Sequence, residues 1–176
     1  MKNRIKILAI MAVLMMFSCA DSKVKISTKN NFEIVKLPDG SIAYLNSNSY
    51  IEYDKNFIQR IVNQKGEVFY DVKKGESPFF VKTAVGEIQV LGTKFNVKSA
   101  VDELELEVEE GIVELKIDNF IRKIKKGQKA FFKESKNGIE MYKAEFKHKK
   151  WIKTLNKEFK KLGKEFNKSF KQIGKI

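Results

Sequence analysis

Short segments of alternating apolar and polar residues recur along the middle of this chain, and residues that favour turns separate them. The clearest segment runs from Glu103 to Glu109, where three apolar residues alternate with four glutamates. A period of two residues is typical of a strand with one buried face. No helical periodicity interrupts the segments between Phe32 and Tyr142. The pattern therefore predicts a mainly β fold: a two-layer antiparallel β-sandwich or roll, or a short β-solenoid.

Turn residues divide this region into short strands. Pro38-Asp39-Gly40, Lys65-Gly66 and Asn137-Gly138 each combine residues that preset or tolerate turn dihedral angles. The strands predicted between such turns cover residues 32–37, 42–45, 50–53, 58–62, 67–72, 79–83, 87–91, 93–98, 103–109 and 112–117. Strands of four to seven residues are of ordinary length for a packed sheet.

The net charge of +13 is concentrated at the two ends of the chain. Residues 1–18 carry a net charge of +3 and residues 143–176 one of +9, whereas residues 19–142 carry only +1. The central β-domain, predicted over residues 32–142, is therefore almost neutral. Its charge gives no indication of nucleic-acid binding, and no nucleic-acid partner is expected.

The N-terminus has the composition of an export signal. Lys2, Arg4 and Lys6 precede an apolar run from Ile7 to Phe17, which is too short to span a bilayer. The only cysteine, Cys19, follows directly, as in a bacterial lipobox. We predict a lipoprotein-type signal peptide over residues 1–18, lipidation of Cys19, and a polar tether over residues 19–31. The mature protein would then be an exported, membrane-anchored component of the cell envelope, facing the periplasm or the cell surface.

The C-terminal segment, residues 143–176, is predicted to be a basic amphipathic helix. Seven apolar residues recur at helical spacing: Trp151, Leu155, Phe159, Leu162, Phe166, Phe170 and Ile173. Lysines occupy the opposite face. Three partners for the apolar stripe stay open at this point. It can dock on the protein's own sheet or on a partner helix, it can lie on an anionic membrane surface, or the lysines can contact nucleic acid, which an exported protein seldom meets.

Residues that could carry chemistry do not form a recognisable catalytic pattern. The sole histidine, His148, has no thiol or carboxylate constellation near it in sequence, so we predict a packed helix residue and no metal site. Glu103, Glu105, Glu107 and Glu109 are expected to form a solvated strand face. Asp39, Asp71 and the tyrosines Tyr50 and Tyr53 give no defined acid–base pair. We predict no cofactor and no enzymatic activity.

An ordered series of short motifs resembles the FecR-type extracytoplasmic domain, named for the ferric-citrate regulator. The series spans roughly residues 32–133 and consists of Leu37-Pro38-Asp39-Gly40-Ser41, Gly66-Glu67-Val68-Phe69-Tyr70-Asp71-Val72, Pro78-Phe79-Phe80-Val81, Leu91-Gly92-Thr93-Lys94-Phe95-Asn96-Val97, Glu110-Gly111-Ile112-Val113 and Lys126-Gly127-Gln128. The glycines at positions 40, 66, 92, 111 and 127 are expected to supply turn dihedrals. Phe69, Phe79 and Phe95 are expected to fill the core, and Thr93 and Asn96 to bond to backbone at a turn.

The resemblance implies an envelope location and a role in binding or signal relay. Many members of the family are anti-sigma regulators that receive a signal from an outer-membrane transporter. The pattern here lacks the sigma-binding and receptor-docking regions of those regulators, so we expect no direct anti-sigma activity. The leading hypothesis is a non-catalytic binding, sensor or adaptor module for another envelope protein or glycan. The alternative is an anti-sigma-type regulator that acts through an inner-membrane partner.

Overall fold

The computed structural model describes residues 22–136 and 138–173, and within these ranges the side chains of all residues except 159 and 162–173. The described chain is mainly β with one long helix, which confirms the predicted fold class. The elements are β1 (Lys23–Ser27), β2 (Glu33–Lys36), β3 (Ile42–Leu45), β4 (Tyr50–Asp54), β5 (Arg60–Asp71), β6 (Phe79–Lys82), β7 (Glu87–Val90), β8 (Lys94–Ser99), β9 (Glu103–Glu110), β10 (Ile112–Ile117), β11 (Phe120–Lys125), β12 (Gln128–Lys133), a 3-10 turn η1 (Glu134–Lys136), β13 (Ile139–Lys143) and α2 (His148–Ile173).

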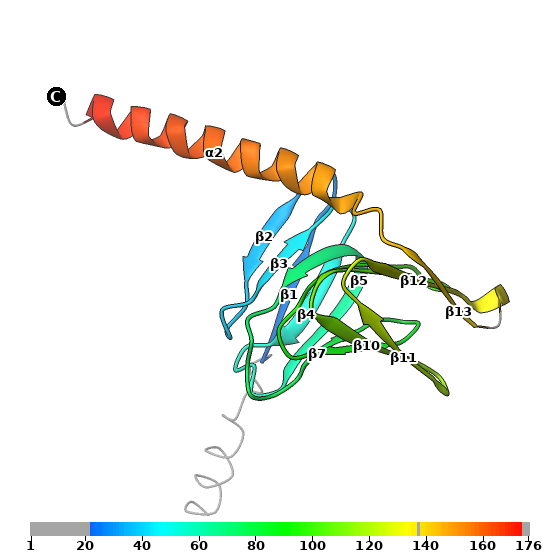
Figure 1. Cartoon of the computed structure of the whole chain (residues 1–176). Coiled ribbons are helices and arrows are strands. Elements are labelled where there is room, and N and C mark those ends of the chain that lie inside the picture. The colour runs from blue at the N-terminus through cyan, green and yellow to red at the C-terminus, as the bar shows by residue number, and fades with distance from the viewer. Residues whose placement is uncertain (1–21, 137, 174–176) are drawn as a thin grey trace, which may run out of the picture.

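The strands form two layers that share β5. Sheet A has the strand order β1-β4-β5-β6-β7-β10-β11, and sheet B has the order β2-β3-β5-β8-β9-β12-β13. The first half of β5 pairs with β4 and β6, and its second half pairs with β3 and β8. Sheet A and sheet B therefore curl around one interior, as Figure 1 shows. This arrangement is a sandwich-like roll and not a solenoid.

Gly66 lies where β5 passes from sheet A to sheet B. Its φ angle is +85°, and a Cβ atom there would lie 2.7 Å from the carbonyl oxygen of Asn48 and from Cα of Ser49. Inside the bend, the buried Gln64 side chain donates hydrogen bonds to the carbonyl oxygens of Gly66 (3.1 Å) and Val97 (2.9 Å). Its own oxygen accepts one from the Tyr70 hydroxyl (3.1 Å), so both polar atoms of the Gln64 side chain are paired.

The core lies between the two sheets and is built from the alternating apolar residues. Leu104, Leu106 and Val108 are fully buried on β9, as their period of two predicts. Phe79 and Phe95 are also fully buried and pack around Tyr70, with ring centroids 5.9 and 5.3 Å from it. Burial of each such side chain stabilises the fold by about 1.5–3 kcal/mol. The core therefore supplies most of the stability, and the polar faces of the strands supply little.

Three features differ from the sequence-based expectation. Residues 19–31 were expected to be a tether, but Lys23–Ser27 form β1, which pairs antiparallel with β4. Val24 and Ile26 pack against the core, and the edge of β4 supplies the backbone partners for the segment. The pairing is also not wholly antiparallel, because β5 and β6 run parallel over Arg60–Asn63. The segments at 58–62 and 67–72, expected as two strands, belong to the single strand β5.

Arg60 ties the turn at Asp39 to the loop before β6. Its guanidinium donates to Asp39 Oδ2 (2.8 Å from Nε) and to the carbonyl oxygens of Lys73 and Ser77 (2.7 and 2.8 Å). The same group lies over the Phe79 ring at 5.4 Å. Because Arg60 is almost completely buried, these bonds hold three chain segments together. The Asp39 carboxylate therefore has a structural role.

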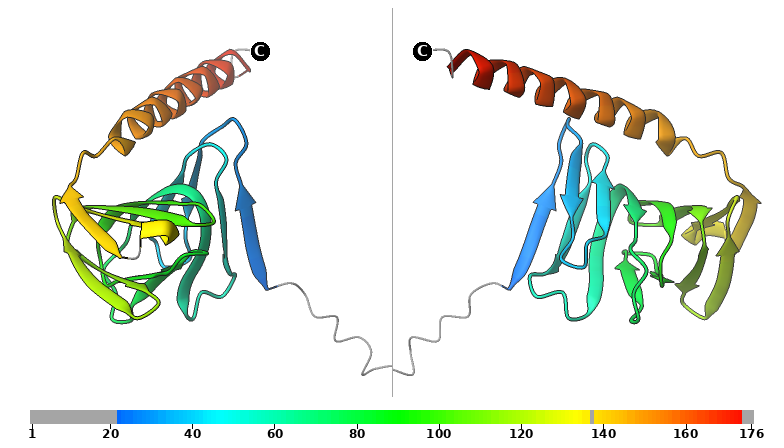
Figure 2. Two further views of the ribbon diagram at one scale, coloured as in Figure 1. Left: turned by 90° about the vertical axis from the view of Figure 1, so that its right-hand side faces the viewer. Right: turned by 60° about the vertical axis from the view of Figure 1, so that its left-hand side comes forward.

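Helix α2 crosses the outer face of sheet B and continues beyond it (Figures 1 and 2). Within the described residues, no helix is both long enough and apolar enough to span a bilayer. The predicted signal peptide and Cys19 lie outside the described residues.

Candidate functional site

The N-terminal turns of α2 dock on the outer face of sheet B through buried polar contacts. We call this region the α2 junction and define it by Glu67, Phe69, Glu107, His148 and Trp151. Glu107 is only 3% exposed, although the other glutamates of β9 reach solvent. Its Oε1 atom accepts hydrogen bonds from the backbone N–H groups of Glu145 (2.8 Å) and Phe146 (3.3 Å). The expectation of a fully solvated glutamate row is therefore wrong at Glu107, because α2 covers it.

His148 lies between two carboxylates. Its Nδ1 is 3.3 Å from Oε2 of Glu107, and its Nε2 is 3.2 Å from Oε2 of Glu109. A neutral imidazole donates one of these bonds and an imidazolium donates both. The ring also stacks on Phe69, with centroids 4.9 Å apart. His148 is thus a buried helix residue, as predicted, but the fold supplies the nearby carboxylates that the local sequence lacks.

Glu109 has its pKa shifted by the same contacts. Burial alone would raise the pKa of this carboxyl, but hydrogen bonds and charge from Lys149 and His148 outweigh burial and hold the pKa below its usual range. The Lys149 ammonium lies 2.9 Å from Oε1 of Glu109 and over the Phe146 ring. The first turn of α2 is therefore held electrostatically on β9.

Trp151 forms the second contact of the α2 junction. Its ring stacks on Phe32, with centroids 5.8 Å apart and planes 4° from parallel, and its Nε1 donates to Oε1 of Glu67 (3.1 Å). Glu67 also accepts from the side-chain amides of Asn96 (3.1 Å) and Asn46 (2.7 Å). Asn96 thus bonds to a side chain on the sheet face and not to backbone at a turn, which corrects the expectation for this residue.

Phe69 is buried, but it does not fill the core between the sheets as predicted. It lies on the outer face of sheet B, where it contacts His148 and Tyr44. The alternation along β5 contains the signal: Val68, Tyr70 and Val72 face the core, so Phe69 has the parity of the polar side. An apolar residue on the polar side of a strand indicates a covering element.

A groove of about 580 Å³ runs beside α2 on the same face. Phe69, Asp71, Lys94 and Glu109 of the sheet line one wall, and Lys149, Ile152, Lys153, Asn156, Lys157 and Lys160 of α2 line the other. Lys94 lies 3.4 Å from Asp71 and 3.7 Å from Glu110, and the charge of Asp71 is the main reason that the pKa of Lys94 is raised. Lys153, Lys157 and Lys160 are exposed.

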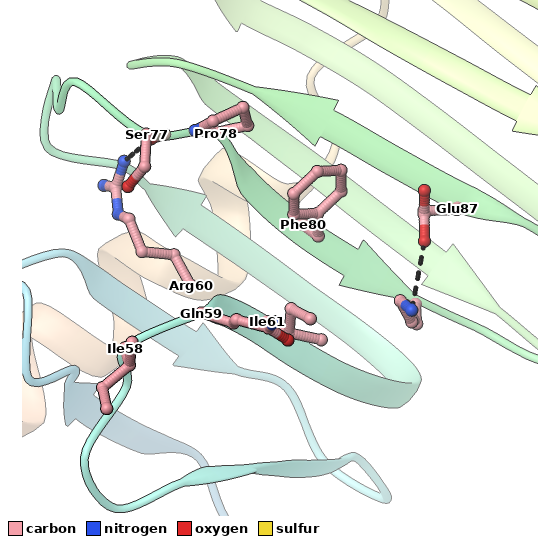
Figure 3. Close-up of a pocket in the computed structure, with 9 residues that line it drawn as sticks. Ile58, Gln59, Arg60, Ile61, Ser77, Pro78, Phe80 and Glu87 are labelled. Carbon is pink, nitrogen blue, oxygen red and sulfur yellow. Dashed lines mark hydrogen bonds and ion pairs between the residues drawn. The ribbon is translucent and has the colours of Figure 1, made fainter.

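No helix among residues 22–136 and 138–173 covers the outer face of sheet A, and smaller hollows lie on it. One, of about 340 Å³, has an apolar lining of Ile58, Ile61, Pro78 and Phe80 (Figure 3). The ion pair of Lys82 and Glu87 (3.3 Å) closes one side of it. The other, also about 340 Å³, is lined by residues that include Leu91 and Ile112. Within residues 22–136 and 138–173, no group of His, Cys, Asp and Glu side chains is arranged to hold a metal ion.

The comparisons with known proteins agree with the motif series. The family model described as FecR protein matches residues 24–114, just over half of the chain. The chain belongs to the FecR family. Two crystal structures, at 2.50 and 1.65 Å resolution, of a candidate anti-sigma factor from Parabacteroides distasonis ATCC 8503 are similar to it. Each has a TM-score of 0.65 and 27% sequence identity, over 69% and 68% of this chain. The chain spans 60% and 59% of those proteins. No curated protein matches it.

The residues of the FecR motifs lie in two parts of this structure. Some form turns or fill the core, and others lie on the outer face of sheet B. Gly40, Gly66, Gly111 and Gly127 have positive φ angles, whereas Gly92 is packed against the Lys74 backbone. Val97 lies in the core, and the Thr93 hydroxyl donates to the backbone of Ile112 (3.4 Å). Glu67, Phe69 and Asn96 instead point outward beneath α2. Of the predicted helix stripe, Leu155 is 1% exposed and Trp151 is half-buried, and the other five side chains lie outside the described set.

Proposed function

We propose that this FecR protein is a non-catalytic binding and adaptor module of the cell envelope. Membership of the family and the likeness to a candidate anti-sigma factor support a regulatory role in signal transduction. The observation that carries the binding role is the asymmetry of the two faces. Sheet B is covered by the start of α2, whereas no helix in the described part of the chain covers the outer face of sheet A.

The uncovered face combines exposed apolar side chains with a free strand edge. Leu91, Ile112 and Ile121 are 52%, 55% and 53% exposed. Strand β11 pairs only with β10 among the described strands, so its second edge can accept a strand from another chain. A partner segment that adds to β11 would lie directly beside Ile121, on the same outer face as Ile112 of β10. Exposed apolar residues gathered beside a free edge are characteristic of interaction surfaces.

Photo-cross-linking in intact cells tests this proposal. A photoreactive amino acid at Ile121 or Ile112 should capture one discrete envelope component, because both sites lie on the outer face of sheet A. Ile112→Lys should abolish capture from position 121. The control is the same photoreactive group at Lys136, on the 3-10 turn at the other sheet. Identical products from all three positions would rule out a specific surface there.

The alternative is an anti-sigma-type regulator that acts through an inner-membrane partner. The candidate anti-sigma factor of Parabacteroides distasonis favours it. In that case the captured component should be a membrane-spanning protein, and loss of the present protein should change transcription that depends on one sigma factor. Unchanged sigma-dependent transcription in the deletion strain would exclude this alternative.

The envelope location and the lipid at Cys19 belong to the same proposal. Ser22 is already tied to the domain, since its carbonyl accepts the Lys55 N–H at 2.6 Å and β1 starts at the next residue. A lipid on Cys19 would therefore hold the β-domain close to the bilayer. Cys19→Ser should remove lipid labelling and release the protein from the membrane fraction. Retention of the unlabelled variant in that fraction would refute the lipid attachment.

A further inference from the structure

Charge is unbalanced in the groove beside α2. Five lysines line this groove, but only two carboxylates, those of Asp71 and Glu109. Both carboxylates are already paired, Asp71 with Lys94 at 3.4 Å and Glu109 with Lys149 at 2.9 Å. Three lysines of the helix wall remain, which we call the lysine row: Lys153, Lys157 and Lys160. The groove therefore has an excess of positive charge.

The lysine row has no counter-charge in the part of the chain that the structure describes. All three side chains are exposed, and none of their ammonium groups has a hydrogen bond or an ion pair with another described residue. The row begins one helical turn after Lys149 and repeats at intervals of four and three residues, so the four lysines share one side of α2. Like charges at such intervals repel each other. An anion bound in the groove would offset this repulsion.

The adjoining side of α2 is closer to neutral. The positions one residue later along the helix are Lys150, Thr154, Glu158 and Lys161, and none of these four side chains lines the groove. Threonine and glutamate thus stand where the groove side has lysines. The excess of positive charge belongs to the side of α2 that borders the groove, and it is not a uniform coat of lysines around the helix.

The groove also has an apolar part, formed by Phe69 of β5 and Ile152 of α2. Phe69 is only 7% exposed, and His148 stacks on its ring at 4.9 Å. A single-stranded nucleic acid needs open aromatic faces on which its bases stack, and Phe69 does not offer one. The lining instead suits a ligand that combines negative charges with apolar groups.

The spacing of the lysine row is close to that of an extended peptide. At 1.5 Å per residue, Lys153, Lys157 and Lys160 follow one another along the helix at about 6 and 4.5 Å. Alternate side chains of a strand share one face and lie about 6.6–6.8 Å apart. The flexible four-carbon stem of lysine accommodates this difference. Acidic residues at alternate positions can therefore each meet one lysine, while the residues between them turn toward Ile152 and Phe69.

We propose that this groove binds an acidic, extended segment of a partner protein, in which carboxylates alternate with apolar residues. Charge complementarity carries the assignment, because three exposed ammonium groups on one wall lack a counter-charge. The groove volume of about 580 Å³ is within the range of ligand sites. The inference rests on the proposed binding role of the protein, but it concerns sheet B, so it can fail while the surface on sheet A stands.

An anionic membrane is the competing occupant of the lysine row. A helix that binds a bilayer inserts its apolar stripe and keeps its lysines at the headgroups. In the described part of α2 the stripe is already engaged, because Trp151 stacks on Phe32 and Leu155 is 1% exposed. A flat bilayer also cannot follow the groove down to Phe69 and Ile152. The observations therefore favour the peptide.

Fluorescence anisotropy with the full-length protein tests the proposal. The probe is a rhodamine-labelled synthetic peptide of about seven residues in which glutamate and valine alternate. It should bind, and its affinity should fall as the salt concentration rises. The same peptide with glutamine in place of every glutamate should bind at least tenfold more weakly. A peptide of the same composition with its glutamates grouped together should also bind more weakly, because alternation is lost.

Two double variants with the same loss of charge separate the groove from the rest of α2. Lys153→Gln with Lys157→Gln should weaken binding of the glutamate–valine peptide at least fivefold. Lys150→Gln with Lys161→Gln is the matched control outside the groove and should change it less than twofold. Glutamine favours helix about as well as lysine does, and circular dichroism verifies that both variants fold.

The proposal is overturned if the glutamate–valine peptide does not bind, if its glutamine form binds equally well, or if the two double variants weaken binding equally. Sedimentation with anionic phosphatidylglycerol vesicles that depends on Lys153 and Lys157, without peptide binding, would assign the lysine row to lipid instead. Photo-cross-linking from Ile121 should be the same in the groove variant as in the unmodified protein. Failure of the groove is thereby distinguished from failure of the surface on sheet A.

Discussion

Glu107 lies on a strand whose other glutamates reach water, yet its carboxylate is buried beneath α2. It satisfies two backbone N–H groups just before the helix and one nitrogen of His148. The backbone N–H groups of Glu145 and Phe146 have no other acceptor among the described residues. A buried donor without an acceptor costs about 1–3 kcal/mol. Glu107 therefore stabilises the attachment of the start of α2 to sheet B.

We expect Glu107→Ala to lower the free energy of unfolding by about 1–3 kcal/mol, because it leaves these donors unpaired. Urea unfolding followed by circular dichroism measures the change. Glu103→Ala is the matched control on the same strand, since Glu103 forms only an exposed ion pair with Lys133 at 3.6 Å. That substitution should cost less than about 1 kcal/mol. Equal losses for the two variants would contradict the role of Glu107.

Docking of α2 should weaken in acid because of Glu109. The pKa of Glu109 is lowered in the folded protein, so its contribution to stability is complete above the unfolded pKa near 4.5 and is lost as the pH falls through the folded pKa. Trp151 is the only tryptophan and lies at the junction, so its fluorescence reports docking. We expect its emission to shift to the red below about pH 4.5. Glu109→Gln should flatten this transition, and an unchanged acid profile would exclude Glu109 as its source.

At the scale of single elements, β5 is the strand on which both sheets depend. The sequence predicts two strands separated by a turn at Lys65-Gly66, because glycine is favoured in turns. In the structure, Gly66 takes a positive φ and the strand continues into sheet B. Only pairing with β3 and β8 on one side and β4 and β6 on the other shows that the glycine marks a bend and not an end.

Gly66→Ala should destabilise the protein by several kcal/mol, because a Cβ atom would meet the backbone of Asn48 and Ser49 at 2.7 Å and the φ angle is +85°. Gly127→Ala is the matched control. Gly127 has a φ of +82° but no atom within 4 Å of an added Cβ, so it should cost only about 1–2 kcal/mol. Thermal unfolding of both variants separates the loss of stability caused by the steric clash from the loss caused by backbone strain. If the Gly66→Ala protein were as stable as the Gly127→Ala protein, the loop at Asn48 would have moved away at little cost in free energy, and the prediction would be wrong.

For the whole molecule, the β-domain should fold without α2. The core between the sheets contains residues of the strands and their connections, and none of the α2 side chains that the structure describes. A chain that ends after Lys147 should keep its strand-rich circular dichroism spectrum and its cooperative unfolding. Its free energy of unfolding should fall by roughly 2–5 kcal/mol, because the surfaces under Trp151 and Leu155 become exposed. A chain that ends after Lys161 keeps these contacts and should match the full length. Loss of cooperative unfolding in the shorter chain would mean that α2 is part of the core.

The sequence by itself determined the fold class of this FecR protein, most of its strands and the inner face of the clearest one. Alternation with a period of two identified the β9 core residues Leu104, Leu106 and Val108, and a helical period identified the stripe that contains Trp151 and Leu155. Such patterns are local, since each follows from the geometry of one strand or one helix.

Only the tertiary structure decided which polar surfaces are covered. His148 and Glu107 are 41 residues apart in the chain, and Trp151 and Glu67 are 84 apart. Their pairing depends on where α2 crosses sheet B, and no local pattern encodes that crossing. The same holds for β1, whose two apolar residues become a strand only because β4 offers an edge to pair with. Burial and hydrogen bonding between distant segments are properties of the assembled fold.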